Sequence, residues 1–187
     1  MKSTPRHSGF TLAELIITLL IVSILIFIAT PSVSALIDDA QRKSAVHDIL
    51  NVMATARQQA IMSQQILTLC PINSSNTCGK DWNSNLSLFV DPDNQRKLTP
   101  TTRIVRTLPP PETGSLRVRS LSKSYFQYRP NGRILSDLGN ITWCPDSNDE
   151  RKAAHLIISR GGRIRIAGDA DSDGIPEGAN GANIICQ

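Results

Sequence analysis

One uncharged apolar stretch near the N-terminus constrains this chain more than any other feature. No charged residue occurs from Leu15 to Ile37, and the segment before Gly9 carries only the bases Lys2 and Arg6 and one histidine. A helix of this length can cross a bilayer, which takes about 20 apolar residues. A secretory signal peptide is cut after its apolar stretch. Here the small residue Gly9 and the acid Glu14 precede the apolar stretch. A cut at that point would leave the stretch intact, so we expect the apolar helix to remain in the mature protein.

The junction before this stretch reads GFTLAE from Gly9 to Glu14. It resembles the prepilin family, which comprises type IV pilins and type II secretion pseudopilins. The resemblance implies that a prepilin peptidase removes residues 1–9 and that the new amine of Phe10 is methylated. It also implies that Glu14 pairs with this amine on a neighbouring subunit during assembly. The alternative is an ordinary signal-anchor helix with an acid near its end.

The resemblance also implies a location. Residues 10–35 are expected to be a transmembrane helix segment in the inner membrane, with the basic leader on the cytoplasmic side and the globular part in the periplasm. The protein is then expected to join a pilus at the cell surface, with other major and minor pilins as partners.

The helix is expected to continue over residues 36–65. Pro31 is predicted to kink it without ending it, because neighbouring groups in a membrane can satisfy the freed carbonyl. In the continuation, apolar residues recur on one face at helical spacing: Val46, Ile49, Leu50, Met53, Ala56, Ala60 and Ile61. This amphipathic half is predicted to pack against a sheet.

From residue 66 the hydrophobic period changes to about two, with turn residues between short runs. The predicted strands are Ile66–Cys70, Leu86–Val90, Arg103–Leu108, Leu116–Leu121, Tyr125–Tyr128, Ile141–Cys144, Leu156–Ser159 and Arg163–Ala167. A long N-terminal helix followed by antiparallel strands predicts an α+β, pilin-like fold, with residues 66–187 as a β-rich periplasmic domain. This order of elements resembles the GspH/FimT branch of pseudopilins and minor pilins.

Four cysteines lie beyond the apolar stretch, at Cys70, Cys78, Cys144 and Cys186. None forms a C-x-x-C pair and the histidines stand apart from them, so a zinc site is not expected. An oxidising periplasm allows disulfides, and four cysteines allow three pairings. We favour Cys70–Cys78, which closes a short loop, together with Cys144–Cys186, which fastens the C-terminal tail.

Positive charge gathers in one window of the chain. Residues 94–136 contain nine basic residues and one acid, Glu112, although the net charge of the whole chain is only +4. Such a concentration attracts polyanions through counterion release and steers their association. The alternative is a solvated face, or one neutralised by Asp91, Asp93 and the acids of the tail. The basic residues are Arg96, Lys97, Arg103, Arg106, Arg117, Arg119, Lys123, Arg129 and Arg133.

Two segments alternate apolar residues with arginines. Residues i and i+2 of a strand share a face, so Arg117 projects with Arg119 and Arg163 with Arg165, at a separation of roughly 6.6 Å. Planar guanidinium groups at this spacing suit successive backbone phosphates. Gly162 and its neighbour Gly161 allow a tight turn and the close approach of a long ligand. The alternate residues are predicted to pack inward: Val118, Ile164 and Ile166.

The run GRIR from Gly162 to Arg165 resembles the GRxR motif of FimT-like minor pilins, which bind DNA during natural transformation. The resemblance implies that Arg163 and Arg165 contact double-stranded DNA, with Arg160 as a weaker candidate. Phosphate contacts do not read bases, so binding is expected to be independent of sequence. The charge pattern, outside the motif, adds further candidate DNA contacts: Arg103, Arg106, Arg117 and Arg119.

Aromatic side chains for stacking on single strands are few: Trp82, Tyr125, Phe126, Tyr128 and Trp143. The alternative function is a structural subunit that works through protein contacts only. It would be a minor pilin that primes pilus assembly or a GspH-like type II secretion pseudopilin.

No nucleophile–histidine arrangement or G-x-S-x-G motif is recognisable, so neither an enzymatic activity nor a cofactor is expected. The run from Asp169 to Gly174 resembles the opening of a calcium loop, but its twelfth position is Asn180, with Glu177 at the ninth. We favour an acidic turn rich in hydrogen bonds from side chain to backbone, without a metal. A calcium-stabilised pseudopilin is the alternative.

Overall fold

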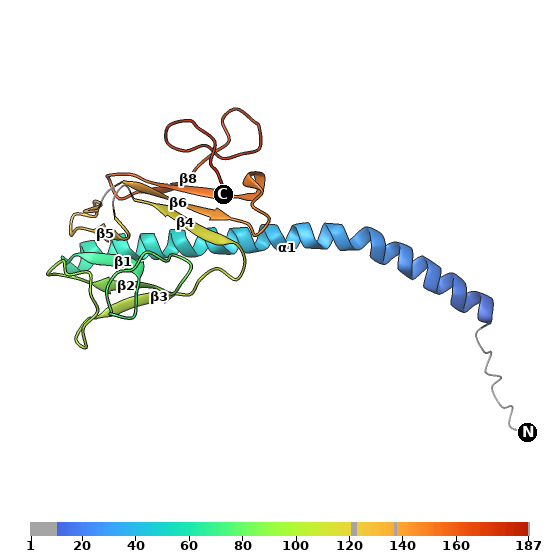
Figure 1. Cartoon of the computed structure of the whole chain (residues 1–187), viewed down its shortest axis with the longest axis horizontal. Coiled ribbons are helices and arrows are strands. Elements are labelled where there is room, and N and C mark those ends of the chain that lie inside the picture. Colours follow the sequence, from blue (N-terminus) through green and yellow to red (C-terminus); the bar gives the residue numbers. More distant parts are fainter. Residues whose placement is uncertain (1–10, 121–122, 137, 187) are drawn as a thin grey trace, which may run out of the picture. The chain divides into compact units, whose positions relative to one another are not determined.

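The computed structural model describes residues 11–120, 123–136 and 138–186, with the backbone alone for residues 28–35. The chain divides into two compact units, Met1–Asp39 and Ala40–Gln187. One helix, α1 (Leu12–Ser63), belongs to both (Figure 1). It continues through Pro31, so the proline does not end it.

The first unit consists of the N-terminal part of α1. Thr11 and Glu14 form a capping box: the Thr11 N–H donates to Glu14 Oε2 at 3.0 Å, and the Glu14 N–H donates to Thr11 Oγ1 at 3.3 Å. Large apolar side chains are exposed from Leu12 to Phe27. Among the residues that the structure describes, no helix is long and apolar enough to cross a membrane. The predicted cleavage and methylation site at Gly9 and Phe10 lies outside the described residues.

The second unit holds two antiparallel four-stranded sheets. The first sheet has the order β3-β2-β1-β5 and the second the order β4-β6-β7-β8. In Figure 1, strands β1, β2 and β3 of the first sheet are drawn below α1 and strands β4, β6 and β8 of the second sheet above it. The strands are β1 (Leu67–Pro71), β2 (Leu86–Val90), β3 (Ile104–Leu108), β4 (Ser115–Arg119), β5 (Phe126–Tyr128), β6 (Gly139–Cys144), β7 (Ala154–Ile158) and β8 (Ile164–Ile166). A short 3-10 helix, η1 (Glu150–Lys152), precedes β7.

The predicted eight strands are all present, and each observed end lies within two residues of the predicted one. The α+β, helix-on-sheet architecture is therefore confirmed. The inward residues of both sheets pack in one core with a face of α1, which explains the hydrophobic period of the strands. Burial itself is nearly continuous in β1, β2, β5 and β7.

That face of α1 is buried in a core shared with both sheets, and it includes Val46, Ile49, Val52, Met53, Ala56 and Ala60. Two residues predicted for this face are less buried than expected. Leu50 is only partly covered, and Ile61 is 43% exposed. Val52 takes a fully buried place instead, so the real face is rotated slightly from the predicted one.

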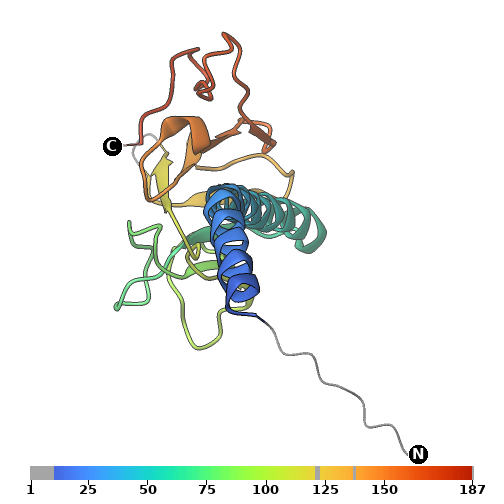
Figure 2. The same cartoon turned by 90° about the vertical axis from the view of Figure 1, so that its right-hand side faces the viewer.

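Both disulfides have the pairing that the sequence favours. Cys70 is bonded to Cys78 and Cys144 to Cys186, with Cα–Cα distances of 5.5 and 5.7 Å. The second bond joins the C-terminal tail to the end of β6. There Cys144 and Cys186 form a small buried cluster with Ala153 and Ile184. Figure 2 shows this tail beyond the second sheet, on the side away from α1.

Candidate nucleic-acid interface

The GRxR segment forms the turn into β8, the edge strand of the second sheet. The turn is closed by hydrogen bonds from the Ser159 N–H to the Arg163 carbonyl at 2.9 Å and from the Gly162 N–H to the Ser159 carbonyl at 2.9 Å. Arg163 and Arg165 are exposed, and Ile164 packs against the core. The predicted alternation is thus present at these positions.

Ile166 departs from the prediction. It was expected to pack inward, but its side chain is 53% exposed. It is the last residue of a three-residue edge strand, where only one neighbouring strand covers it. Val118 of β4 packs against the core as predicted.

Gly162 holds this turn against the first sheet and is itself buried. Its φ of +75° is a conformation that side chains rarely adopt, and a Cβ there would lie 2.1 Å from the Gly132 carbonyl oxygen. The Tyr128 hydroxyl of β5 donates to the Gly162 carbonyl at 3.1 Å. The expectation that Gly162 lets a long ligand approach the backbone is therefore wrong, because the first sheet's own turn occupies that space.

This close contact brings two arginine-bearing turns together. The turn at residues 129–133 is closed by the Arg129 N–H on the Arg133 carbonyl at 2.9 Å, and the Ile134 N–H donates to the Arg160 carbonyl at 3.3 Å. Arg129, Arg133 and Arg160 are all exposed. We call the five side chains on this surface the paired-turn arginines: Arg129, Arg133, Arg160, Arg163 and Arg165.

Two of the five were not selected from the sequence. Arg129 and Arg133 belong to the basic window, but nothing in a linear pattern joins them to the GRxR motif some 30 residues later. The only sequence signal was a second glycine turn, Asn131-Gly132. The backbone carbonyl of Gly132 lies against Gly162.

The outer face of the second sheet, turned away from α1, carries further arginines. Arg119 is the cross-strand partner of Asn140, Asn140 of Ile157, and Ile157 of Arg165. These four residues therefore form one row across all four strands. Paired residues of antiparallel strands share a face. Arg117 and Arg119 therefore lie on the same face as Arg165, at the opposite edge. Three strand spacings separate the two edges by about 14 Å.

Arg103 and Arg106 are not brought to this surface. Arg106 lies on β3, the far edge of the first sheet, and Arg103 directly precedes that strand. The Arg106 guanidinium is 3.9 Å from the carboxylate of Asp48 on α1. Strand β3 is an edge of the first sheet and β8 an edge of the second, and Figure 1 draws them below and above α1, so the predicted set of DNA contacts divides into two surfaces.

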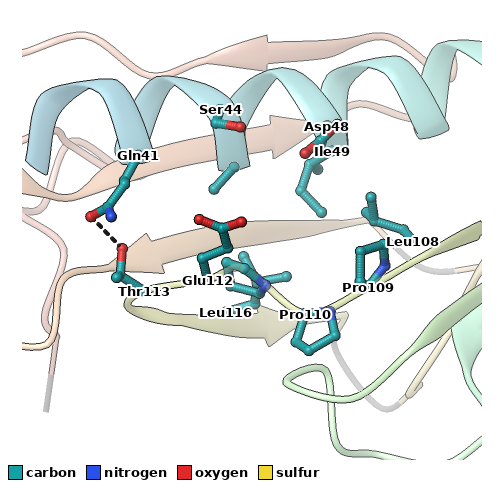
Figure 3. A pocket seen from close by; sticks show the side chains of 12 residues that line it. Gln41, Ser44, Asp48, Ile49, Leu108, Pro109, Pro110, Glu112, Thr113 and Leu116 are labelled. Atoms are coloured by element: carbon teal, nitrogen blue, oxygen red, sulfur yellow. Dashed lines mark hydrogen bonds between the residues drawn. The ribbon is translucent and has the colours of Figure 1, made fainter. Parts of the chain in front are cut away.

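An acidic cavity of about 200 Å³ lies between α1 and the loop that follows β3. Figure 3 shows the carboxylates of Asp48 and Glu112 at this cavity, beside two prolines of the loop. Thr113 Oγ1 donates to Gln41 Oε1 at 2.8 Å and ties the loop to the helix. The sign of its charge makes this cavity unsuitable for a polyanion.

Most of the candidate stacking aromatics belong to the core. Trp82, Phe126, Tyr128 and Trp143 are buried. Tyr125 is partly exposed, but its ring lies 5.4 Å from the Arg96 guanidinium and its hydroxyl accepts from Arg96 Nη1 at 3.1 Å. In the second unit, the described aromatic side chains therefore offer little stacking surface for single-stranded bases.

Two buried titratable groups lie close to the arginines. Burial raises the pKa of the Tyr128 hydroxyl, and the positive charge of Arg57 partly opposes this rise. Burial also lowers the pKa of His155 on β7, and the charge of Arg165 lowers it further. Both groups are therefore neutral at pH 7, and the positive charge of this surface comes from its arginines.

The acidic segment of the tail brings Asp169, Asp171 and Glu177 together, with carboxylate oxygens within 4.8 Å of one another. The Glu177 carboxylate accepts from the Ala170 N–H at 2.7 Å, and Asp169 accepts from the Gly174 N–H at 2.8 Å. These are the hydrogen bonds of an acidic turn, as the sequence favoured.

Comparison with known proteins places this fold in a family. Residues 45–162 match the family model described as type II transport protein GspH, and residues 4–30 match the prokaryotic N-terminal methylation motif. No protein with a curated description matches the chain.

Solved structures agree in fold. The type IV minor pilin FimU of Pseudomonas aeruginosa (strain PAO1) superimposes in two crystal forms. In one, the TM-score is 0.53 at 16% identity, over 79% of this chain and 96% of FimU. In the other, it is 0.51 at 17% identity, over 67% and 92%. The minor pseudopilin EpsH of the Vibrio cholerae type 2 secretion system gives 0.48 at 10% identity, over 67% of this chain and 95% of EpsH.

The family match covers more than half of the chain, from α1 to the turn before β8. The N-terminal motif and the helix-on-sheet fold agree with it. The protein therefore belongs to the GspH family, with an N-terminal methylation motif and a pilin-like fold.

Proposed function

We propose that this protein is a minor type IV pilin that binds double-stranded DNA without sequence specificity, for uptake in natural transformation. The observation that carries the proposal is the contact between the two arginine-bearing turns, which gathers five exposed arginines on one surface. Residues 129–133 and 159–163 contain no acid. Arginine forks on turns without acids are suited to phosphate oxygens.

The geometry favours a duplex over a single strand. Strand and turn arginines can follow a phosphate backbone, whereas most aromatic rings that could stack on bases are buried. Arg117 and Arg119, about 14 Å away on the same face, extend the positive surface across the sheet. Modest affinity for each subunit would suffice, since several subunits in one filament supply avidity.

The same proposal includes the route to the filament. A prepilin peptidase would cut between Gly9 and Phe10, and the amine of Phe10 would then be methylated. Residues 10–35 would hold the protein in the inner membrane with the β-rich unit in the periplasm, until assembly with other pilins. The match to the methylation motif over residues 4–30 supports this route. Glu14, which caps α1 through Thr11 in the single chain, would exchange this bond for the amine of a neighbouring subunit.

The test is a DNA titration with the fragment 36–187, which retains every buried core residue and both disulfides. Binding of a duplex is measured by fluorescence anisotropy across a salt series. The double variant Arg163→Ala/Arg165→Ala should lower the log–log salt slope by roughly 1.8, because each lost phosphate contact contributes about 0.9. Arg129→Ala/Arg133→Ala should lower it by a similar amount.

Arg103→Ala/Arg106→Ala is the matched control, since it removes the same charge from the other surface. It should leave the slope close to that of the wild type. An equal loss in all three double variants would mean that charge alone attracts the DNA, without a defined interface. Absence of binding by folded wild-type fragment at low salt would rule out the DNA-binding proposal.

A structural subunit without DNA binding is the second candidate, as a pilus-priming minor pilin or a GspH-like pseudopilin. The family match, whose description is a type II transport protein, favours it. In that case the paired-turn arginines would contact other subunits. Their substitution would reduce assembly of the filament, and neither the wild type nor the variants would bind DNA.

A further inference from the structure

A second cavity lies on the outer face of the second sheet, beneath the C-terminal tail. Its volume is about 440 Å³. Strands β4, β6 and β7 form its floor and residues 178–185 form its wall. The polar side chains that line it are Arg117, Arg119, Asn140, Thr142, His155, Asn180 and Asn183.

The tail is held in place over this floor. The Cys144–Cys186 disulfide fastens its end, and the Ile184 N–H donates to the Pro176 carbonyl at 3.2 Å. Within the tail, the Gly178 N–H donates to the Ala182 carbonyl at 2.8 Å. The wall of the cavity is therefore built by covalent and backbone bonds.

His155 lines this cavity and has one ring nitrogen that is not used in a hydrogen bond among the described residues. The residue is only 3% exposed, and its Nδ1 lies 2.7 Å from Thr142 Oγ1. Its Nε2 is buried and has no hydrogen-bond partner among the described residues. When the Thr142 hydroxyl donates to Nδ1, the proton of the neutral ring is on Nε2, which becomes a donor. An unpaired buried donor is costly, and a ligand oxygen would satisfy it.

The charge of the lining has one sign. It includes two arginines and no acidic residue. In the preceding loop, Glu177 accepts from the N–H groups of Ala170 and Asp171, and Asp169 accepts from that of Gly174. Asp173 Oδ2 accepts from Nδ2 of Asn183, so one carboxylate reaches a side chain of the lining. The cavity thus combines guanidinium, imidazole and carboxamide donors, which together are suited to an oxyanion.

We propose that this cavity binds a phosphate group of a phosphorylated ligand. Arg119 and Arg117 would hold the phosphate oxygens, with His155 Nε2 as a further donor. The volume of the cavity lies in the range of small-molecule sites and is larger than the space that a bare anion fills. The phosphate can come from a small phosphorylated molecule or from the 5′ end of a nucleic acid. The site uses Arg117 and Arg119, which also extend the proposed DNA surface, but its lining includes none of the paired-turn arginines, so it can bind a phosphate whether or not those arginines bind DNA.

The test follows the side-chain nitrogens of the histidines by NMR, using the full chain in a nonionic detergent with ¹⁵N-labelled histidine. The probes are inorganic phosphate, adenosine monophosphate, and one short duplex with and without 5′-phosphates. A phosphorylated probe should shift the Nε2 resonance of His155 and leave that of the exposed His47 in place. The variant His155→Gln assigns the signal.

Arg119→Gln should weaken the binding at least about tenfold, as loss of a charge-assisted hydrogen bond predicts. Arg151→Gln removes the same charge from exposed η1, outside the cavity, and should leave the affinity unchanged. A response to the small probes would identify a small-molecule site. A response confined to the 5′-phosphorylated duplex would identify a site for the end of a nucleic acid. No shift of His155 with any probe, or equal binding by Arg119→Gln, would overturn the proposal.

Discussion

At the scale of single residues, Gly162 decides where the arginines of the GRxR segment lie. It has a positive φ and no room for a Cβ beside the Gly132 carbonyl. Its carbonyl oxygen also accepts a hydrogen bond from the hydroxyl of buried Tyr128. One glycine therefore sets both the turn into β8 and its contact with the turn at residues 129–133.

Gly162→Ala should consequently destabilise the fold by roughly 1–3 kcal/mol, because it adds backbone strain and a steric clash at the contact between the turns. Gly161→Ala is the matched control: a Cβ there meets only Ser159 Oγ, at 3.8 Å. Urea unfolding of both variants measures the difference. Equal stability of the two would show that the contact with Gly132 does not constrain the turn.

Asp91 is a second residue whose role depends on its surroundings. From the sequence it could neutralise the basic surface, but it is 4% exposed. Its carboxylate accepts from Thr68 Oγ1 at 2.8 Å and from the N–H groups of Gln95 and Arg96 at 2.7 and 3.0 Å. It anchors the loop after β2 and does not screen the arginines.

Asp91→Asn should therefore lower the free energy of unfolding by roughly 1–3 kcal/mol, since an amide cannot accept all of these hydrogen bonds. The DNA salt slope should stay as in the wild type. Asp93→Asn, at an exposed position of the same loop, is the control and should change the stability little. A raised DNA affinity in Asp91→Asn would contradict this account.

At the scale of elements, β7 carries a titratable group on the outer face of the second sheet, where His155 is buried beside the C-terminal tail. Burial and the charge of Arg165 lower the pKa of His155 from its ordinary value of 6.5. The folded protein therefore binds this proton less readily than the unfolded chain. The stability that the neutral ring of His155 contributes is fully present above pH 6.5. It is lost as the pH decreases from there toward the pKa of the folded state.

We expect the free energy of unfolding to decrease as the pH is lowered through this window. The decrease should be smaller in His155→Gln, which lacks the titrating ring, and in Arg165→Gln, which lacks the neighbouring charge. Urea unfolding at stepped pH measures the slope, and an NMR titration of the ring gives the pKa directly. A folded pKa at or above 6.5 would contradict the expected direction.

At the scale of the whole molecule, the two disulfides differ in the length of chain that they close. Cys144 and Cys186 are 42 residues apart in sequence, and Cys70 and Cys78 only 8. Loop-closure entropy assigns about 4 kcal/mol to the longer loop and about 2.6 kcal/mol to the shorter one. The longer loop contains β7, β8 and the paired turn at residues 159–163.

The double variant Cys144→Ser/Cys186→Ser should accordingly lose about 1.4 kcal/mol more stability than Cys70→Ser/Cys78→Ser. It should also release the tail from the outer face, while β8 stays bonded to β7. Chemical denaturation measures the first effect, and hydrogen exchange at residues 178–185 the second. Unchanged protection of the tail amides would mean that its own hydrogen bonds suffice to hold it.

Local signals in the sequence were sufficient for the helix, the strand positions and the N-terminal motif. A run without charges, a hydrophobic period of two and separating turn residues depend on neighbours a few positions apart, and α1 and the eight strands follow them. The small deviations are at edges, as at Ile166, where the number of neighbouring strands decides burial.

What only the tertiary structure decided is which arginines share a surface. Strand order separates Arg103 and Arg106 from Arg163 and Arg165, and register places Arg119 in line with Arg165. The contact of Gly132 with Gly162 brings Arg129 and Arg133 to the interface, and the tail closes a cavity over His155. These relations join residues that are distant in sequence, and such pairings depend on the packing of the whole core, which a local pattern does not contain.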